Sequence, residues 1–77
     1  MLNADKLRGY IASAGMTQKE LADKIGMSEN NFSSKMKGKS NFYTSQAIEI
    51  CKILNITDDS EKVAIFLPNA SQNQDRI

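Results

Sequence analysis

Few residues in this chain have the types and spacing that catalysis or metal binding requires. The 77-residue sequence has no histidine, which removes the commonest general base and a frequent zinc ligand. Its single cysteine, Cys51, can form neither an internal disulfide nor a thiolate metal cluster. Asp58, Asp59 and Glu61 are close in sequence, but they suit the start of a helix, where the helix dipole favours negative charge. We therefore expect a protein that is not an enzyme and that uses no metal or other cofactor.

Lysines give a clearer chemical signal than any catalytic group. The net charge is only +1, but residues 1–39 carry seven cations and four anions, which gives +3. Residues 40–77 carry three cations and five anions, which gives −2. Three of the lysines fall within residues 35–39, KMKGK. Such clusters are common on solvated surfaces, but they also attract the phosphates of nucleic acids. The structure predicted for the neighbouring residues must distinguish these two possibilities.

Length and hydropathy indicate one small globular domain. The hydrophobic fraction of 40% and the charged fraction of 25% are ordinary for such a domain. No apolar run approaches the roughly 18 residues of a membrane span, and the N-terminus lacks the apolar core of a signal peptide. We expect a cytoplasmic protein with no membrane partner. Residues 1–67 should form the domain, and the polar residues 68–77 should form a flexible tail.

Residues 17–38 include most of the lysine cluster, and their sequence predicts two short helices joined by a tight turn. Thr17 and Glu20 have the spacing of a capping box, in which each side chain accepts a hydrogen bond from the other residue's backbone. Gly26 suits the reversal of the chain, and Ser28 is a suitable N-cap for the second helix. A helix-turn-helix of this kind presents its second helix outward, most commonly to the major groove of DNA.

The remaining segments predict an all-α, compact bundle of four to five short helices. Apolar spacing places helices near residues 3–14, 17–25, 28–37 and 44–54. A short fifth element should follow Asp58, although residues 63–67, VAIFL, are too few for their period to distinguish helix from strand. The expected core consists of the inward-facing apolar residues: Leu7, Ile11, Leu21, Ala22, Ile25, Phe32, Met36, Ala47, Ile50, Cys51 and Leu54.

From about residue 7 to residue 56, the sequence resembles the helix-turn-helix domain of phage Cro and repressor proteins, the lambda-repressor-like or XRE-type family. The resemblance is carried by Gln18, Leu21–Ala22, Ile25–Gly26, Ser28, Phe32 and the run ICKILNI at 50–56. One departure is the pair Lys35–Met36, because family members usually have an aliphatic residue followed by glutamate there. The resemblance implies a sequence-specific transcriptional regulator that occupies a DNA operator.

The resemblance also implies which residues would contact DNA. With Phe32 and Met36 directed inward, a rotation of about 100° per residue places the polar side chains of the same helix on its outer arc. The expected base contacts are Glu29, Asn30, Asn31 and Ser34. The expected phosphate contacts are Gln18, Lys35, Lys37, Lys39, Ser40 and Asn41.

The sequence is also compatible with two other functions and with assembly into a homodimer. The same fold serves anti-repressors that bind another regulator protein, and the modest net charge and Glu29 favour that alternative. It also serves the DNA-binding antitoxins of toxin–antitoxin pairs. Four bulky apolar residues lie near the end of the domain: Val63, Ile65, Phe66 and Leu67. Part of this cluster must pack on the first and fourth helices, and what remains exposed suggests a homodimer that would bind a palindromic operator.

Overall fold

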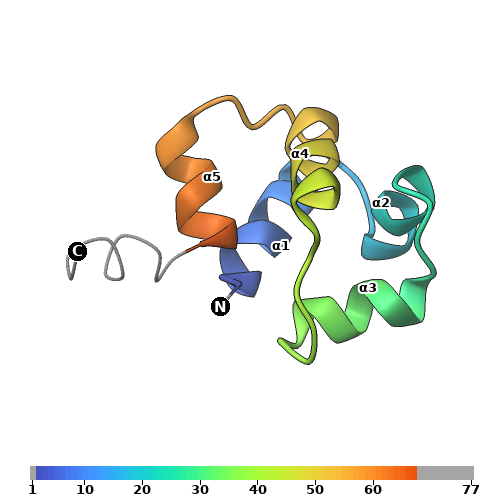
Figure 1. The fold of residues 1–77 in the computed structure, drawn as a ribbon. Coiled ribbons are helices and arrows are strands. Elements are labelled where there is room, and N and C mark those ends of the chain that lie inside the picture. Colours follow the sequence, from blue (N-terminus) through green and yellow to red (C-terminus); the bar gives the residue numbers. More distant parts are fainter. Residues whose placement is uncertain (1, 68–77) are drawn as a thin grey trace, which may run out of the picture.

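Five helices make up most of residues 2–67, the part of the chain that the computed structural model describes. They are α1 (Ala4–Ser13), α2 (Gln18–Lys24), α3 (Glu29–Met36), α4 (Thr44–Ile53) and α5 (Asp59–Phe66). In Figure 1, α2 and α3 lie together on one side of the molecule, and α5 lies beside α1 on the other. The all-α fold is confirmed, and the first four helices begin and end within one residue of their predicted bounds. The predicted tail, 68–77, lies outside the described residues.

Side-chain caps determine where four of the helices begin. Asn3, Thr17, Ser28 and Asp58 each accept a hydrogen bond from a backbone N–H in the first turn of the helix that follows. Such a cap satisfies one of the donors that a helix start leaves without a partner. Asp58 therefore begins a helix rather than a strand, and residues 63–66 belong to α5.

One backbone motif ends each of the first four helices. At the end of α2, the Met27 N–H donates to the Ala22 carbonyl over 2.9 Å, and the Gly26 N–H donates to the Asp23 carbonyl over 3.1 Å. These paired bonds define a Schellman motif, in which the first of the two donor residues takes a positive φ. Gly26 has φ +72° and Gly38, after α3, has φ +82°. The chain thus reverses sharply after each of these helices.

The core is close to the predicted one, with two corrections and three additions. Leu7, Leu21, Ala22, Phe32 and Ile50 have no exposed surface. Ile25 and Ala47 are half-buried rather than buried. Ile25 lies at the C-cap, past the regular part of α2, and Ala47 lines an open groove between α4 and α5. The core also includes three residues that the helical pattern did not predict: Met27, Ile56 and Ile65.

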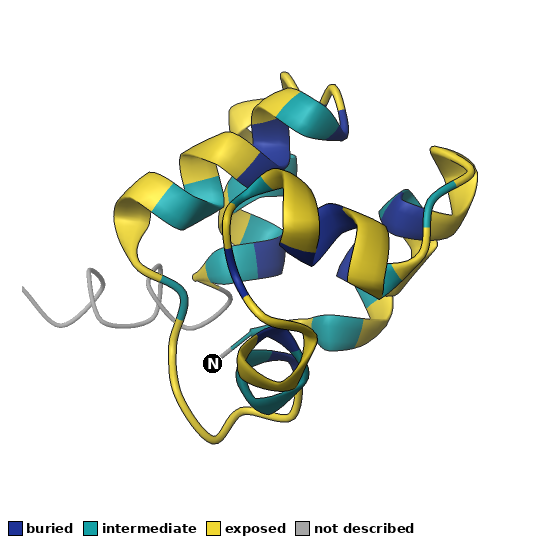
Figure 2. Cartoon of the chain, turned by 90° about the vertical axis from the view of Figure 1, so that its right-hand side faces the viewer, coloured by how far each residue is buried: buried dark blue, intermediate teal, exposed yellow. Residues whose placement is uncertain are grey.

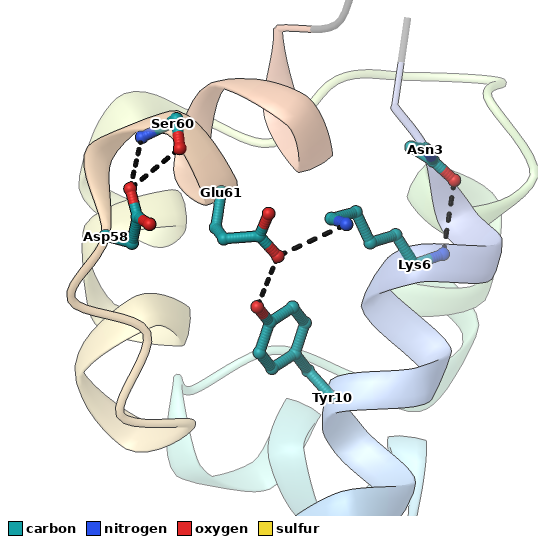
Figure 3. A network of polar contacts seen from close by, with 6 residues as sticks. All are labelled: Asn3, Lys6, Tyr10, Asp58, Ser60 and Glu61. Atoms are coloured by element: carbon teal, nitrogen blue, oxygen red, sulfur yellow. Dashed lines mark hydrogen bonds and ion pairs between the residues drawn. The ribbon is translucent and has the colours of Figure 1, made fainter.

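A polar network fixes α5 against α1 (Figure 3). The Tyr10 hydroxyl donates a hydrogen bond to the Glu61 carboxylate, and the Lys6 ammonium lies 3.2 Å from the same carboxylate oxygen. The Asn3 N–H donates to the Ile65 carbonyl over 2.7 Å. The hydrogen bond from Tyr10, followed by that from Lys6, lowers the pKa of Glu61, and the same bond raises the pKa of Tyr10. The network therefore favours an ionised Glu61.

Candidate nucleic-acid interface

The α2–α3 unit has the local structure that its sequence predicts. The Thr17 hydroxyl accepts from the Glu20 N–H over 3.1 Å, and the Glu20 carboxylate accepts from the Thr17 N–H over 2.8 Å. The Ser28 hydroxyl accepts from the Asn31 N–H over 3.1 Å, which starts α3. Met27, between the two helices, is buried. The turn is therefore held by backbone bonds and also by packing.

The two sides of α3 differ sharply in exposure. Phe32 has no exposed surface and Met36 is 5% exposed, so both anchor α3 to the core. Figure 2 views α3 nearly end-on at the lower edge of the molecule, with its buried residues turned toward the other helices. The opposite side of the helix faces solvent and is available to a ligand.

The four predicted base contacts lie together on α3. Glu29, Asn30 and Asn31 are exposed in its first turn, and Ser34 follows one turn later and is half-buried. Amide, hydroxyl and carboxylate groups can all form hydrogen bonds with the edges of bases. The structure thus places a short row of donors and acceptors on the outer side of the helix.

Four of the predicted phosphate contacts lie together where α3 ends. The Lys39 N–H donates to the Ser34 carbonyl over 3.0 Å, and this bond turns the chain back at Gly38. Lys37, Lys39, Ser40 and Asn41 are all exposed there. Residues 2–67 contain four ion pairs, and neither Lys37 nor Lys39 takes part in them. Their charges are therefore not neutralised by a neighbouring carboxylate of the described chain.

The position of Lys39 is unusual among the helix ends of this molecule. The corresponding residues after α1, α2 and α4 are Met16, Met27 and Ile56, which all pack on the core. An apolar residue is the ordinary choice at this position, because it covers the last turn of the helix. After α3 a lysine replaces it, so this helix end is polar and faces solvent.

Two predicted phosphate contacts are placed differently from the rest. Gln18 is the first residue of α2 and is half-buried, on a different helix from the others. The Lys35 ammonium donates a hydrogen bond to the Asn41 carbonyl over 2.6 Å. It also lies 4.9 Å from the centre of the Tyr43 ring and 5.9 Å from that of Phe42. Lys35 is thus engaged with the α3–α4 loop.

A second, apolar surface lies between α4 and α5. It surrounds a groove of about 510 Å³, whose lining includes Ile48, Val63 and Leu67. These three side chains are 50%, 41% and 56% exposed. Ile65 is completely buried and faces the core from α5, so it is removed from the residues predicted to form a homodimer contact. The sequence did not predict Ile48 as part of this surface, because it lies off the apolar face that Ala47, Ile50 and Cys51 form on α4.

Other kinds of site find little support in the described residues. Within residues 2–67, no three or more side chains of His, Cys, Asp and Glu come close enough to hold a metal ion. Burial raises the pKa of the Cys51 thiol, which disfavours the reactive thiolate. None of the five helices is long and apolar enough to span a bilayer.

Comparison with known proteins identifies the family. No curated protein and no solved structure matches the chain. The sequence model of the Cro/C1-type HTH DNA-binding domain matches residues 6–57, which include α2, α3 and α4 entirely. The match agrees with the capped α2–α3 unit and with the exposed outer side of α3. The chain therefore belongs to the Cro/C1-type helix-turn-helix DNA-binding domain family.

Proposed function

We propose that this protein is a sequence-specific transcriptional regulator of the phage Cro/repressor type, which occupies a DNA operator through α3. One observation carries the proposal: the polar outer side of α3 is continuous with an exposed end that bears Lys37 and Lys39. Bases and phosphates are neighbours in DNA, and a ligand with both chemistries fits both parts of this surface.

The residue types on α3 suit base recognition in the major groove. Asn30 and Asn31 can each form two hydrogen bonds with adenine, and Glu29 can accept one from cytosine. Ser34 can bond to several bases. The side chains of Lys37, Lys39, Ser40 and Asn41 would contact phosphates beside the groove, and Gln18 would do so from α2. Phosphate contacts would set the orientation of the helix, and the base contacts would provide sequence preference.

We further propose that the protein binds DNA as a symmetric homodimer. A single short helix offers few base contacts, and a second copy on a palindromic operator doubles them. The exposed Ile48 of α4, Val63 of α5 and Leu67, directly after α5, form an apolar surface that suits self-association. Phe66 is half-buried against the Phe42 ring and can contribute only its remaining surface. Half-sites would lie about one turn of DNA, roughly 34 Å, apart.

Selection from a pool of random duplexes by the purified protein, at a stated salt concentration, tests DNA recognition. We expect enrichment of a short motif and a mobility shift with that motif at lower protein concentration than with random duplex. Failure to enrich any sequence, together with tight binding to a regulator protein encoded nearby, would instead support the anti-repressor alternative.

Analytical ultracentrifugation at micromolar concentration tests the dimer. Val63→Gln should shift the protein toward monomer, whereas Ala12→Gln, at an exposed position of α1, should not. A wild-type protein that stays monomeric both free and on DNA would remove the dimer proposal. DNA recognition by α3 would still stand in that case.

A further inference from the structure

We infer that Lys35 is a positioning residue, which fixes the α3–α4 loop (residues 38–43) in the conformation that presents its polar groups to DNA. The link to DNA rests on the proposed function, whereas the contacts between Lys35 and the loop do not depend on it. Sequence reasoning alone treated this lysine as one more phosphate contact.

Lys35 is bonded to the backbone of the loop. Within the described chain, the one hydrogen bond to the backbone of residues 40–42 is the one from the Lys35 ammonium to the Asn41 carbonyl, at 2.6 Å. The loop on either side is held by Lys39, bonded to Ser34, and by Tyr43, bonded to the Gln46 side chain. Lys35 therefore bridges a stretch that other backbone bonds leave open.

Lys35 also lies close to aromatic side chains of the loop. Its ammonium lies over the Tyr43 ring, 4.9 Å from the centre, a distance at which the face of the ring attracts a cation. The neighbouring Phe42 ring packs edge-on against Phe32 of α3, at 5.3 Å, and against Phe66 of α5, at 6.0 Å. Phe42 thus anchors the loop to the core, and Lys35 contacts the next residue of the same loop, Tyr43.

Lys35 differs from the two neighbouring lysines in exposure. Lys37 and Lys39 are exposed, whereas Lys35 is half-buried. One N–H donor of its ammonium is bonded to the Asn41 carbonyl, and the ammonium lies over the Tyr43 ring, so this side chain is already engaged with the loop. The exposed groups that the loop carries, Lys39, Ser40 and Asn41, are therefore left to meet the phosphates, and their spacing depends on Lys35.

The first test measures the free protein by NMR and needs no DNA. We expect amide order parameters of about 0.85 at residues 40–42 in the wild type. In Lys35→Met, the order parameters of the same amides should fall to about 0.6 or below. Lys35→Arg should keep the wild-type values, because a guanidinium can also stack on Tyr43 and donate to the carbonyl. Lys37→Gln is the matched control and should leave the loop unchanged.

The second test measures binding to a selected duplex over a range of salt concentrations. Lys35→Met should weaken binding roughly five-fold, the size of one modest hydrogen bond, without changing the dependence on salt. Lys37→Gln should instead lower the salt slope by about one, as expected for a lost phosphate contact. Lys35→Arg should restore the affinity.

The two tests separate the inference from the proposed function. A protein that binds no DNA but shows the loop loosening in Lys35→Met would overturn the function and keep the positioning role. An unchanged loop, combined with a salt slope lowered by one, would make Lys35 a phosphate contact. A loop already mobile in the wild type would also overturn the inference.

Discussion

The C-terminal ends of α2 and α3 share a backbone conformation and differ in their surroundings. Each helix ends in a glycine with positive φ, followed by a residue whose N–H returns to the last turn. After α2 that residue is Met27, which is buried, and after α3 it is Lys39, which is exposed. Backbone geometry therefore determines where each helix stops. The side chain that follows determines whether the end joins the core or faces a ligand.

The largest expected effect on stability is at the end of α2, where the residue after the glycine is apolar. Met27→Ala should lower the free energy of unfolding by about 2 kcal/mol or more, because it removes a buried side chain and leaves a cavity. Lys39→Ala should change it by no more than about 0.5 kcal/mol, as is usual for an exposed position. Urea denaturation followed by circular dichroism measures both. Equal losses would show that the two ends do not differ as described.

Glycine substitutions test the feature that the two ends share. Gly26→Ala and Gly38→Ala should each cost about 1 kcal/mol, because positive φ is unfavourable for alanine. Space is not the reason, since an added Cβ would meet no atom within 4 Å at either position. Gly9→Ala, inside α1, should instead stabilise by up to about 1 kcal/mol. A clear difference between the costs at positions 26 and 38 would argue against a common motif.

A smaller effect on stability should appear where α5 meets α1. The pKa of Glu61 is lower in the folded protein than its ordinary value of 4.5. The network therefore stabilises the fold above that value, and this contribution disappears as the pH falls through the folded pKa. Unfolding of the wild type and of Glu61→Gln should accordingly converge in acid. A difference that stays constant with pH would mean that Glu61 acts through packing alone.

The sequence predicted best what depends on local spacing. The capping box at Thr17, the turn at Gly26 and the N-cap at Ser28 are all short-range patterns, and they placed α2 and α3 correctly. Met27 and Ile56 were missed because they follow a helix and so fall outside its 3.6-residue period. An apolar residue directly after a helix-ending glycine or asparagine is the signal that would have found them.

The surroundings of Lys35 and Ile65 could not be predicted by the same reasoning. The partners of Lys35 are a carbonyl and two rings in an irregular loop, whose path no periodic pattern describes. Ile65 was one of four bulky apolar residues in the short run VAIFL, and only the direction of α5 against α1 decides which of them is buried. Tertiary packing sets both environments, and the DNA contacts of α3 remain predictions.

The central claim is that the outer side of α3 binds bases while the lysine-bearing end of α3 binds phosphates. The most direct test compares Asn31→Ala and Lys39→Gln in salt titrations, on a selected duplex and on a random one. Asn31→Ala should cost about 1–3 kcal/mol on the selected duplex, with random binding and the salt slope unchanged. Lys39→Gln should weaken binding to both duplexes alike and lower the slope by about one. Wild-type binding by both variants, on both duplexes at every salt concentration, would contradict the account.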